Sequence, residues 1–448
     1  MFRAAQSLFT IALLLVLLLP GPLALAQNRQ MTLLLDAELD DYVNSLARPI
    51  LKAADLNPDN VHILVLNDPS INAFVNSQEA VFIMSGLLLE AENTNEVAGV
   101  IAHEVGHLKG HHLLRLSQTG QALSLPTLFG SILGLGAMVA GAPSAGAAVM
   151  VGSQAAGISS MLRFSRTQEQ QADQIAVTLM QQEGISTEGL KNFFGRLHTQ
   201  GLMYNQAPPE YLMTHPKPSG RQDFLENVTQ SPYSPSPQEK LAFERIQAKV
   251  FALTHTPAKT RRYFFDNDTP LAEYARAVAF TKAGEYTEAE LSLEKAAKGL
   301  NAENDPYFTE LRAHIALEHG NTAEAVAKFT EALDLKPAST LIRYHYGRAL
   351  LISGDIKKAI AQLERVIQRH GQWWMAHQQL GLAYGKNGEL GKSHISFAQA
   401  ALYSGKYEDA RFHLNVAEKK IGSDDNKNAM LQTQTIKMLK QELEKLSD

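Results

Sequence analysis

Two histidines and a glutamate carry the strongest chemical signal in the sequence. His103 and His107 are four residues apart, so on a helix both imidazoles lie on one face and can share one metal ion. Glu104 is next to His103, where its carboxylate can take a proton from an attacking water. The pattern predicts a hydrolytic site with about one Zn²⁺ per chain. A polar helix face that contains histidines by chance is the alternative interpretation, and the spacing argues against it.

Two further histidines, His111 and His112, follow the motif. His107 and His111 are also four residues apart, but Leu108 then occupies the position that the base would need. We therefore place the site at the upstream pair.

Zinc in a catalytic site needs a third protein ligand and an open position. The best donor is Glu169, on a helix that we expect over about residues 167–183, ended by Gly184. Asp173 lies one turn further on the same face, where it can accept a hydrogen bond from a ligating imidazole. A Glu and an Asp at this spacing are usually only a solvated helix face. The histidine motif upstream is what favours a metal site.

Other elements must position these residues. The helix that carries the histidines should begin near Asn93 or Thr94, either of which can cap it, and should continue to about Leu116. The β-rich runs 61–66 and 81–84 predict strands. Residues 72–76 predict a third strand between them, and as an edge strand it could hold an extended substrate by backbone pairing.

Residues 116–162 contain no charged side chain, and they are interrupted by Pro126 and Pro143. One interpretation is a helical hairpin or flap over the active site, which would let residues 117–162 contact the substrate or a membrane surface. A transmembrane hairpin is the second interpretation and a buried core segment is the third. The density of Gly, Pro and Ser weakens the hydropathy and favours the flap.

The first 26 residues have the pattern of a cleaved export signal. Arg3 gives a positive start, residues 8–19 form an apolar core, and Ala24-Leu25-Ala26 is a small-x-small cleavage site. The apolar core is shorter than the roughly 20 residues that span a bilayer. An uncleaved anchor is the alternative, which the break at residues 20–22 disfavours. We therefore expect an exported mature protein.

The composition limits the classes of partner. Without the signal, 40 basic and 46 acidic residues leave a formal charge of −6, so nothing suggests nucleic acid. The chain has no cysteine. An exported protein without disulfides must rely on its hydrophobic cores and on metal for stability.

The second half of the chain is repetitive. Gly284, Gly320, Gly354 and Gly388 mark turns at spacings of 36, 34 and 34 residues. This is the helix–turn–helix period of tetratricopeptide repeats. Following a linker at 231–270, we predict a repeat domain at 271–448 that ends in an amphipathic capping helix and binds proteins or peptides on its concave surface.

Three motifs in order resemble one peptidase family. They are H-E-x-x-H, the Ser-Arg-x-x-Glu-x-x-Ala-Asp run that ends at Asp173, and Thr214-His215-Pro216 followed by Arg221. Together they resemble the gluzincin peptidases related to HtpX and the CAAX prenyl endopeptidases. With the export signal and the repeats, the chain is similar to the beta-barrel assembly-enhancing proteases of the bacterial periplasm. The resemblance covers essentially the whole mature chain.

The resemblance implies a mostly α fold, with a gluzincin-type α+β metallopeptidase domain and small β-sheet at 27–230, followed by an α-solenoid of tetratricopeptide repeats. It makes His103, His107 and Glu169 the zinc ligands, Glu104 the general base, and Asp173 the support of a ligand. It also suggests a role for His215 near the metal, either filling the open coordination position at rest or stabilising the oxyanion. Pro216 and Pro218 would stiffen its loop. Without the resemblance, His215 would be an ordinary surface or capping residue.

The implied function is that of a periplasmic zinc endopeptidase that cleaves misfolded or stalled proteins during outer-membrane protein assembly and quality control. The repeats would recruit clients, among them outer-membrane proteins and their assembly machinery. The alternative is an assembly chaperone or adaptor in which the repeats do the essential work while the protease site is mostly shut. A third class, an integral membrane protease, depends on residues 116–162.

Overall fold

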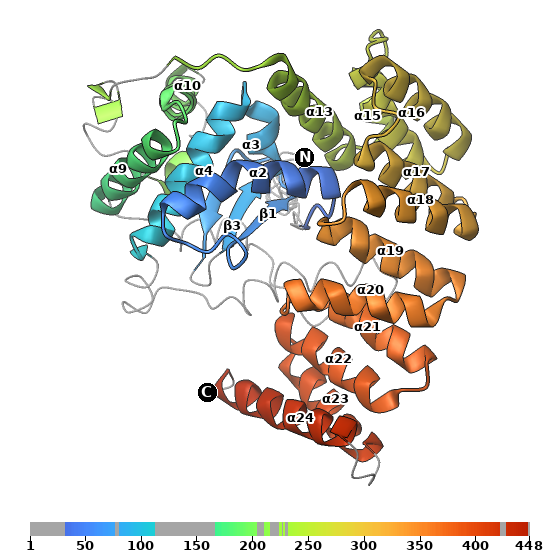
Figure 1. Ribbon diagram of the computed structural model, residues 1–448. Coiled ribbons are helices and arrows are strands. Elements are labelled where there is room, and N and C mark those ends of the chain that lie inside the picture. The colour runs from blue at the N-terminus through green and yellow to red at the C-terminus, as the bar shows by residue number, and fades with distance from the viewer. Residues whose placement is uncertain are drawn as a thin grey trace, which may run out of the picture.

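The computed structural model comprises an N-terminal part, which contains the expected peptidase domain and is called the peptidase part below, and an array of helical hairpins that runs down one side of it (Figure 1). The export signal expected at 1–26 and the uncharged residues 117–162 lie outside the described residues, as do Pro216, Pro218 and Arg221. Within the described residues, no helix has both the length and the apolar character needed to cross a bilayer. The structure describes residues 32–76, 80–112, 166–203, 210–215, 224–225, 227–228, 232–421 and 427–446.

A three-stranded sheet underlies the peptidase part, in the order β1-β3-β2. The central strand β3 (Ala80–Met84) is parallel to β1 (His62–Leu66) and antiparallel to β2 (Ala73–Val75). Every residue of β3 is buried, because helices cover it and strands flank it on both sides. All three strands were predicted, and β2 is an edge strand as expected.

The helix that carries the histidine motif is α4 (Thr94–Lys109), which packs against β2 and β3. Asn93 caps it as predicted, since its side chain accepts a hydrogen bond from the backbone N–H of Glu96 at 3.1 Å. The helix ends well before the predicted boundary near Leu116. Gly110 follows its last turn, and His111 adopts a left-handed φ of 51° that stops the α-helical path.

Among the helices that pack against α4, two make the most extensive contacts. One is α9 (Arg166–Gln182), which matches the predicted second helix and is followed by Gly184 at φ 66°. The other is α10 (Glu188–Met203), where Arg196 donates two 2.6 Å hydrogen bonds to the Glu96 carboxylate of α4. The other helices that the described residues of this part form are α2 (Ala37–Ala53), α3 (Ser85–Glu90) and α11 (Glu210–Thr214).

The segment predicted as a linker contains two helices, α13 (Pro237–Thr254) and α14 (Pro257–Tyr263). Helix α13 buries Phe243, Ile246 and Val250 in the peptidase core. Its Ala248 and Ala252 lie in the core of the first repeat. The connection therefore packs against both parts of the chain along the length of α13.

The repeats form antiparallel helix pairs that stack in chain order (Figure 1). The four turn glycines predicted from the period all have positive φ, between 76° and 90°, a conformation that glycine adopts without strain. The helices are α15 (Pro270–Ala283), α16 (Tyr286–Leu300), α17 (Pro306–Glu318), α18 (Thr322–Leu335), α19 (Thr340–Ser353), α20 (Ile356–Arg369), α21 (Trp374–Lys386), α22 (Leu390–Tyr403), α23 (Tyr407–Lys420) and the capping helix α24 (Lys427–Lys445).

A buried polar cluster joins α2 to the connecting helix and the first repeat. The Glu38 carboxylate accepts hydrogen bonds from Lys249 at 3.1 Å and Tyr274 at 2.6 Å, and it also pairs with Arg245. Glu38 and Lys249 are each 3% exposed, so neither charge is satisfied by bulk solvent. The cluster fixes the peptidase part against the array.

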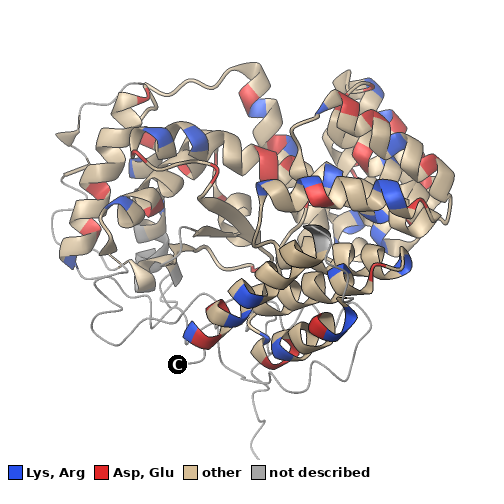
Figure 2. Ribbon diagram, turned by 60° about the horizontal axis from the view of Figure 1, so that its bottom comes forward, with Lys and Arg blue, Asp and Glu red and all other residues tan. Residues whose placement is uncertain are grey.

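Elsewhere on the repeats, acidic and basic residues are interspersed (Figure 2).

Candidate metal and catalytic site

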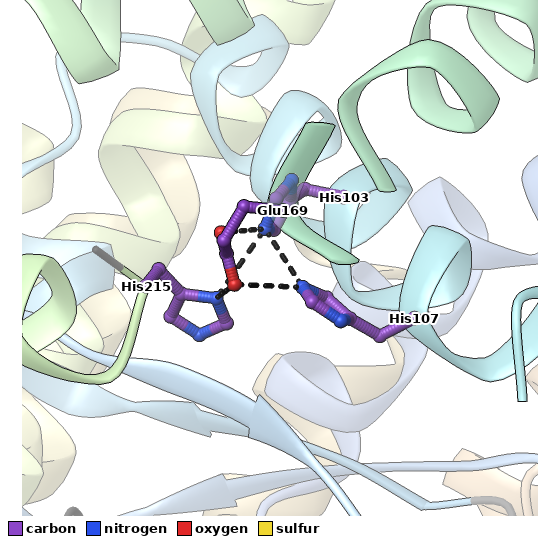
Figure 3. Close-up of side chains that lie close together, drawn as sticks. All are labelled: His103, His107, Glu169 and His215. Atoms are coloured by element: carbon purple, nitrogen blue, oxygen red, sulfur yellow. Dashed lines mark hydrogen bonds and ion pairs between the residues drawn. The ribbon is translucent and has the colours of Figure 1, made fainter. Parts of the chain in front are cut away.

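Four side chains from three segments converge in the peptidase part (Figure 3). His103 and His107 come from α4, Glu169 comes from α9, and His215 follows α11. All four are 0% exposed. Their ligand atoms lie close enough together to hold one metal ion.

The spacing of three of these donors fits zinc. His103 Nε2 and His107 Nε2 are 3.1 Å apart, and the two oxygens of Glu169 lie near them, Oε2 at 3.3 Å from His103 Nε2 and Oε1 at 3.4 Å from His107 Nε2. Zinc bonds of about 2.0–2.1 Å in tetrahedral geometry set donor atoms roughly 3.3–3.4 Å apart. The sequence-predicted ligand set is therefore brought together at the required distances.

The hydrogen bond between His103 and Asp173 fixes the tautomer of the imidazole. His103 Nδ1 lies 2.9 Å from Asp173 Oδ1, and an ionised carboxylate can only accept, so Nδ1 donates. The lone pair of His103 is then on Nε2, which faces Glu169. Asp173 is thus in the position that the sequence predicted for it.

His107 is held by a different partner. His107 Nδ1 lies 3.0 Å from His112 Nδ1, and His112 Nε2 lies 3.1 Å from Gln171 Oε1. The amide oxygen only accepts, so His112 donates through Nε2 and accepts from His107 at Nδ1. Both motif imidazoles therefore direct lone pairs at each other across 3.1 Å. Two acceptors this close repel, and a shared cation removes the repulsion, so the donor set fits a metal.

The protonation states also suit metal binding. Burial lowers the pKa of His107 well below its ordinary value, which keeps the imidazole neutral. Burial by itself raises the pKa of Glu169, but the facing imidazoles, His215 foremost, reverse this and hold it well below its ordinary value. Neutral imidazoles and an ionised carboxylate are the forms that ligate.

His215 lies inside the cluster. Its Nε2 is 3.3 Å from the backbone oxygen of Ala73, which only accepts, so Nε2 carries the proton. In the neutral ring the lone pair is then on Nδ1, which lies 3.4 Å from His103 Nε2 and 3.1 Å from Glu169 Oε1. The ring stacks on Tyr211 with centroids 4.4 Å apart. His215 is thus positioned as a fourth donor.

Glu104 is also 0% exposed and is oriented by a tyrosine. Tyr211 donates a hydrogen bond to Glu104 Oε1 at 3.3 Å, and His215 Nε2 lies 3.5 Å from the same oxygen. The other oxygen, Oε2, is buried and has no hydrogen-bond partner within the part of the chain that the structure describes. Burial raises the pKa of Glu104, while His215 and His103 oppose that rise. A raised pKa makes this carboxylate a stronger base.

The approach of α9 to α4 depends on a glycine in the motif. A Cβ at Gly106 would lie 2.6 Å from the carbonyl oxygen of Ala172 and 3.1 Å from its Cα. Ala172 precedes Asp173 on α9, and Glu169 is on the same helix. A side chain at position 106 would therefore push both carboxylates away from the histidines.

Comparison with known proteins agrees with this geometry. Residues 34–229 match peptidase family M48, and residues 316–380 match a tetratricopeptide repeat family. The matched residues 34–229 therefore correspond to an M48 peptidase domain. Together with the His and Glu cluster, this makes the protein a metalloprotease.

Several characterised proteins are similar to the chain. The Beta-barrel assembly-enhancing protease of Escherichia coli K12 is 26% identical over 340 residues, which cover 74% of this chain and 68% of that protein. The protein of the same name from Yersinia pestis is 26% identical over 341 residues, covering 74% and 69%. Metalloprotease LoiP of Escherichia coli K12 is 31% identical over 148 residues, covering 32% and 54%.

Sequence reasoning missed two features of this M48 site. Tyr211, which orients Glu104 and stacks on His215, has no sequence signal beyond its aromatic type. His112 stood out only as an extension of the histidine cluster, and its contact with His107 arises because the chain turns back after Gly110.

Proposed function

We propose that the protein is a zinc-dependent endopeptidase in which His103, His107 and Glu169 hold one zinc ion. The observation that carries the proposal is the convergence of three buried donors at 3.1–3.4 Å, with both imidazole lone pairs directed inward. When bound, zinc would polarise the scissile carbonyl and acidify the attacking water.

Glu104 is the general base in this proposal. Its Oε2 has no hydrogen-bond partner among the described residues, so it can accept the proton of the attacking water and pass it to the leaving amine nitrogen. Tyr211 holds the other oxygen and keeps the carboxylate aimed. Asp173 and His112 hold the two imidazoles in the tautomer that leaves each Nε2 available.

The edge strand β2 supports an extended substrate. Asn72 accepts from Met84 and Asn76 donates to Ala80, so these two residues direct their backbone groups into the sheet. Ala73 and Val75, which alternate with them, consequently direct their backbone N–H and C=O groups away from β3, toward the open edge of the sheet. The Ala73 carbonyl is already next to the cluster through His215. A substrate strand paired along this edge would pass beside the metal donors, a mode that selects unfolded segments.

His215 acts as a latch at rest. As a fourth donor it excludes the water that Glu104 must activate, and its Nε2 proton occupies the Ala73 carbonyl that a substrate strand would use. Substrate and latch therefore compete for the same backbone oxygen. The competing role is that His215 donates to the oxyanion during attack.

The cellular role follows from the sequence pattern and from the names of the relatives. The protein is exported to the periplasm by a cleaved signal, and its repeats recruit protein clients. These clients are outer-membrane proteins, misfolded or stalled, and their assembly machinery. The interspersed charges on the repeats suit contacts with protein segments (Figure 2).

The latched geometry supports a second function, that of an assembly chaperone or adaptor whose repeats are the main functional element. Complementation of a deletion strain by Glu104→Gln separates the two. The protease proposal predicts that Glu104→Gln fails to complement while it accumulates bound clients that can be recovered by affinity purification. Full complementation by this variant would favour the adaptor.

A further inference from the structure

A second group of potential metal donors lies within the repeats. Glu310 and His314 are one turn apart on α17, and His345 is on α19, the corresponding helix of the next repeat. Their ligand atoms all lie within 4.8 Å of one another. None of these residues belongs to the peptidase site.

The three side chains pack closely together and are mostly buried, unlike a cluster of charged residues on the surface. His314 Nε2 lies 3.6 Å from Glu310 Oε1, and the rings of His314 and His345 are 4.5 Å apart at 78°. Phe329 packs against the His314 ring at 5.1 Å. Glu310 is 3% and His345 is 6% exposed, whereas the side chain of His314 is 28% exposed. Two donors are thus buried, and the third leaves a route from solvent.

The state of His345 is an independent indication. Both of its ring nitrogens are buried and neither forms a hydrogen bond of normal geometry within the described residues, although the backbone of Leu35 is near. Buried polar atoms nearly always have hydrogen-bond partners. The described protein atoms supply none of normal geometry to this imidazole, so we expect a partner that is not among them. Its ring lies next to that of His314, so the two imidazoles are close enough to share one ligand.

A nearby lysine does not exclude a cation. Lys249 is close enough to act on Glu310 electrostatically, but its Nζ lies 2.7 Å from Asp36 Oδ2 and 3.1 Å from Glu38 Oε2. Those two carboxylates neutralise the ammonium group. Because other carboxylates hold Lys249, the oxygens of Glu310 remain available to a metal.

We propose that Glu310, His314 and His345 form a second zinc site, which ties the first helices of two successive repeats together. Two imidazoles and a carboxylate are the same donor types as in the peptidase site, and they suit zinc. Zinc would draw donors now up to 4.8 Å apart to roughly 3.4 Å, which side-chain rotation supplies. Because the site adjoins Leu35 and Lys249, the metal stiffens the repeats where they contact the peptidase part.

The test is the zinc content of the purified full-length chain after dialysis against excess zinc and then buffer. His345→Leu, which keeps an apolar side chain in the buried position, should lose about one zinc per chain relative to wild type. Glu310→Gln should lose the same zinc. His319→Ala is the matched control, because it removes an exposed histidine that directly follows α17 and should leave the content unchanged.

The comparison of zinc contents does not depend on the peptidase site, because wild type and the variants share that site and only the difference in zinc per chain between them is used. Adding zinc should raise the thermal unfolding midpoint of Glu169→Ala by more than that of Glu169→Ala/His345→Leu, in which only the peptidase site can still bind zinc. If His345→Leu does not fold, His314→Ala at the half-buried position carries the same test. Wild-type zinc content in folded Glu310→Gln and in His314→Ala would overturn the proposal.

Discussion

Replacement of His215 by alanine tests how the peptidase site is controlled. The substitution removes the Nδ1 donor near His103 and Glu169, the Nε2 hydrogen bond to the Ala73 carbonyl, and the stacking on Tyr211. It leaves the other three donors in place. We expect His215→Ala to retain its zinc and to cleave faster without any client bound.

The size of the increase follows from the lost contacts. With zinc bound, the interaction of His215 Nδ1 with the cation is charge-assisted, and like a hydrogen bond to a charged group it contributes about 1.5–3 kcal/mol to the closed arrangement. At about 1.4 kcal/mol per factor of ten, its loss raises the population of the open site by roughly 10–150-fold. Basal casein cleavage and self-cleavage should rise by up to that factor.

The assay is initial-rate cleavage of labelled casein at low substrate, with zinc content measured on the same samples. His255→Ala is the control, because the ring of this half-buried histidine contacts Thr254 and Phe251 at the end of its own helix. A loss of about 100–1,000-fold would instead identify His215 as an oxyanion donor and refute the latch. An unchanged rate would remove His215 from both roles.

Three further predictions concern the supports of the site. Asp173→Ala should lower zinc affinity or activity by roughly 10–100-fold, because His103 loses its orienting partner; wild-type zinc titration and rate would contradict this. Gly106→Ala should reduce zinc content by displacing α9, and a fully loaded, active variant would show that the helices can adjust. Glu38→Leu leaves the buried Tyr274 hydroxyl without its acceptor, while Lys249 keeps Asp36, and it should lower the free energy of unfolding by about 1–3 kcal/mol in urea titrations. A change below about 1 kcal/mol would mean that the cluster contributes little.

Local patterns made much of this arrangement predictable. The i, i+4 spacing of His103 and His107 is enough to place two donors on one face of a helix. Asn93 marks the start of α4, and Gly184 marks the end of α9. The glycine period likewise predicts the repeat turns. In each case the deciding interactions lie within a few residues of one another, so the sequence contains them.

The features that were not predictable depend on contacts distant in sequence. Tyr211 reaches Glu104 across 107 residues, and no local pattern indicates that pairing. The early end of α4 depends on a backbone turn at His111, a residue that is equally compatible with a continuing helix. Helix α13 packs against the peptidase part and against the first repeat. Those two surfaces exist only after the peptidase part and the repeat have folded.

The central claim is that Glu104 is the base of a zinc peptidase, and one comparison tests it most directly. Zinc content and casein cleavage should be measured together for wild type and Glu104→Gln. The account predicts equal zinc, about one ion per chain in the peptidase site, and a rate at least about 100-fold lower in the variant. Normal cleavage by Glu104→Gln with zinc bound would contradict the account.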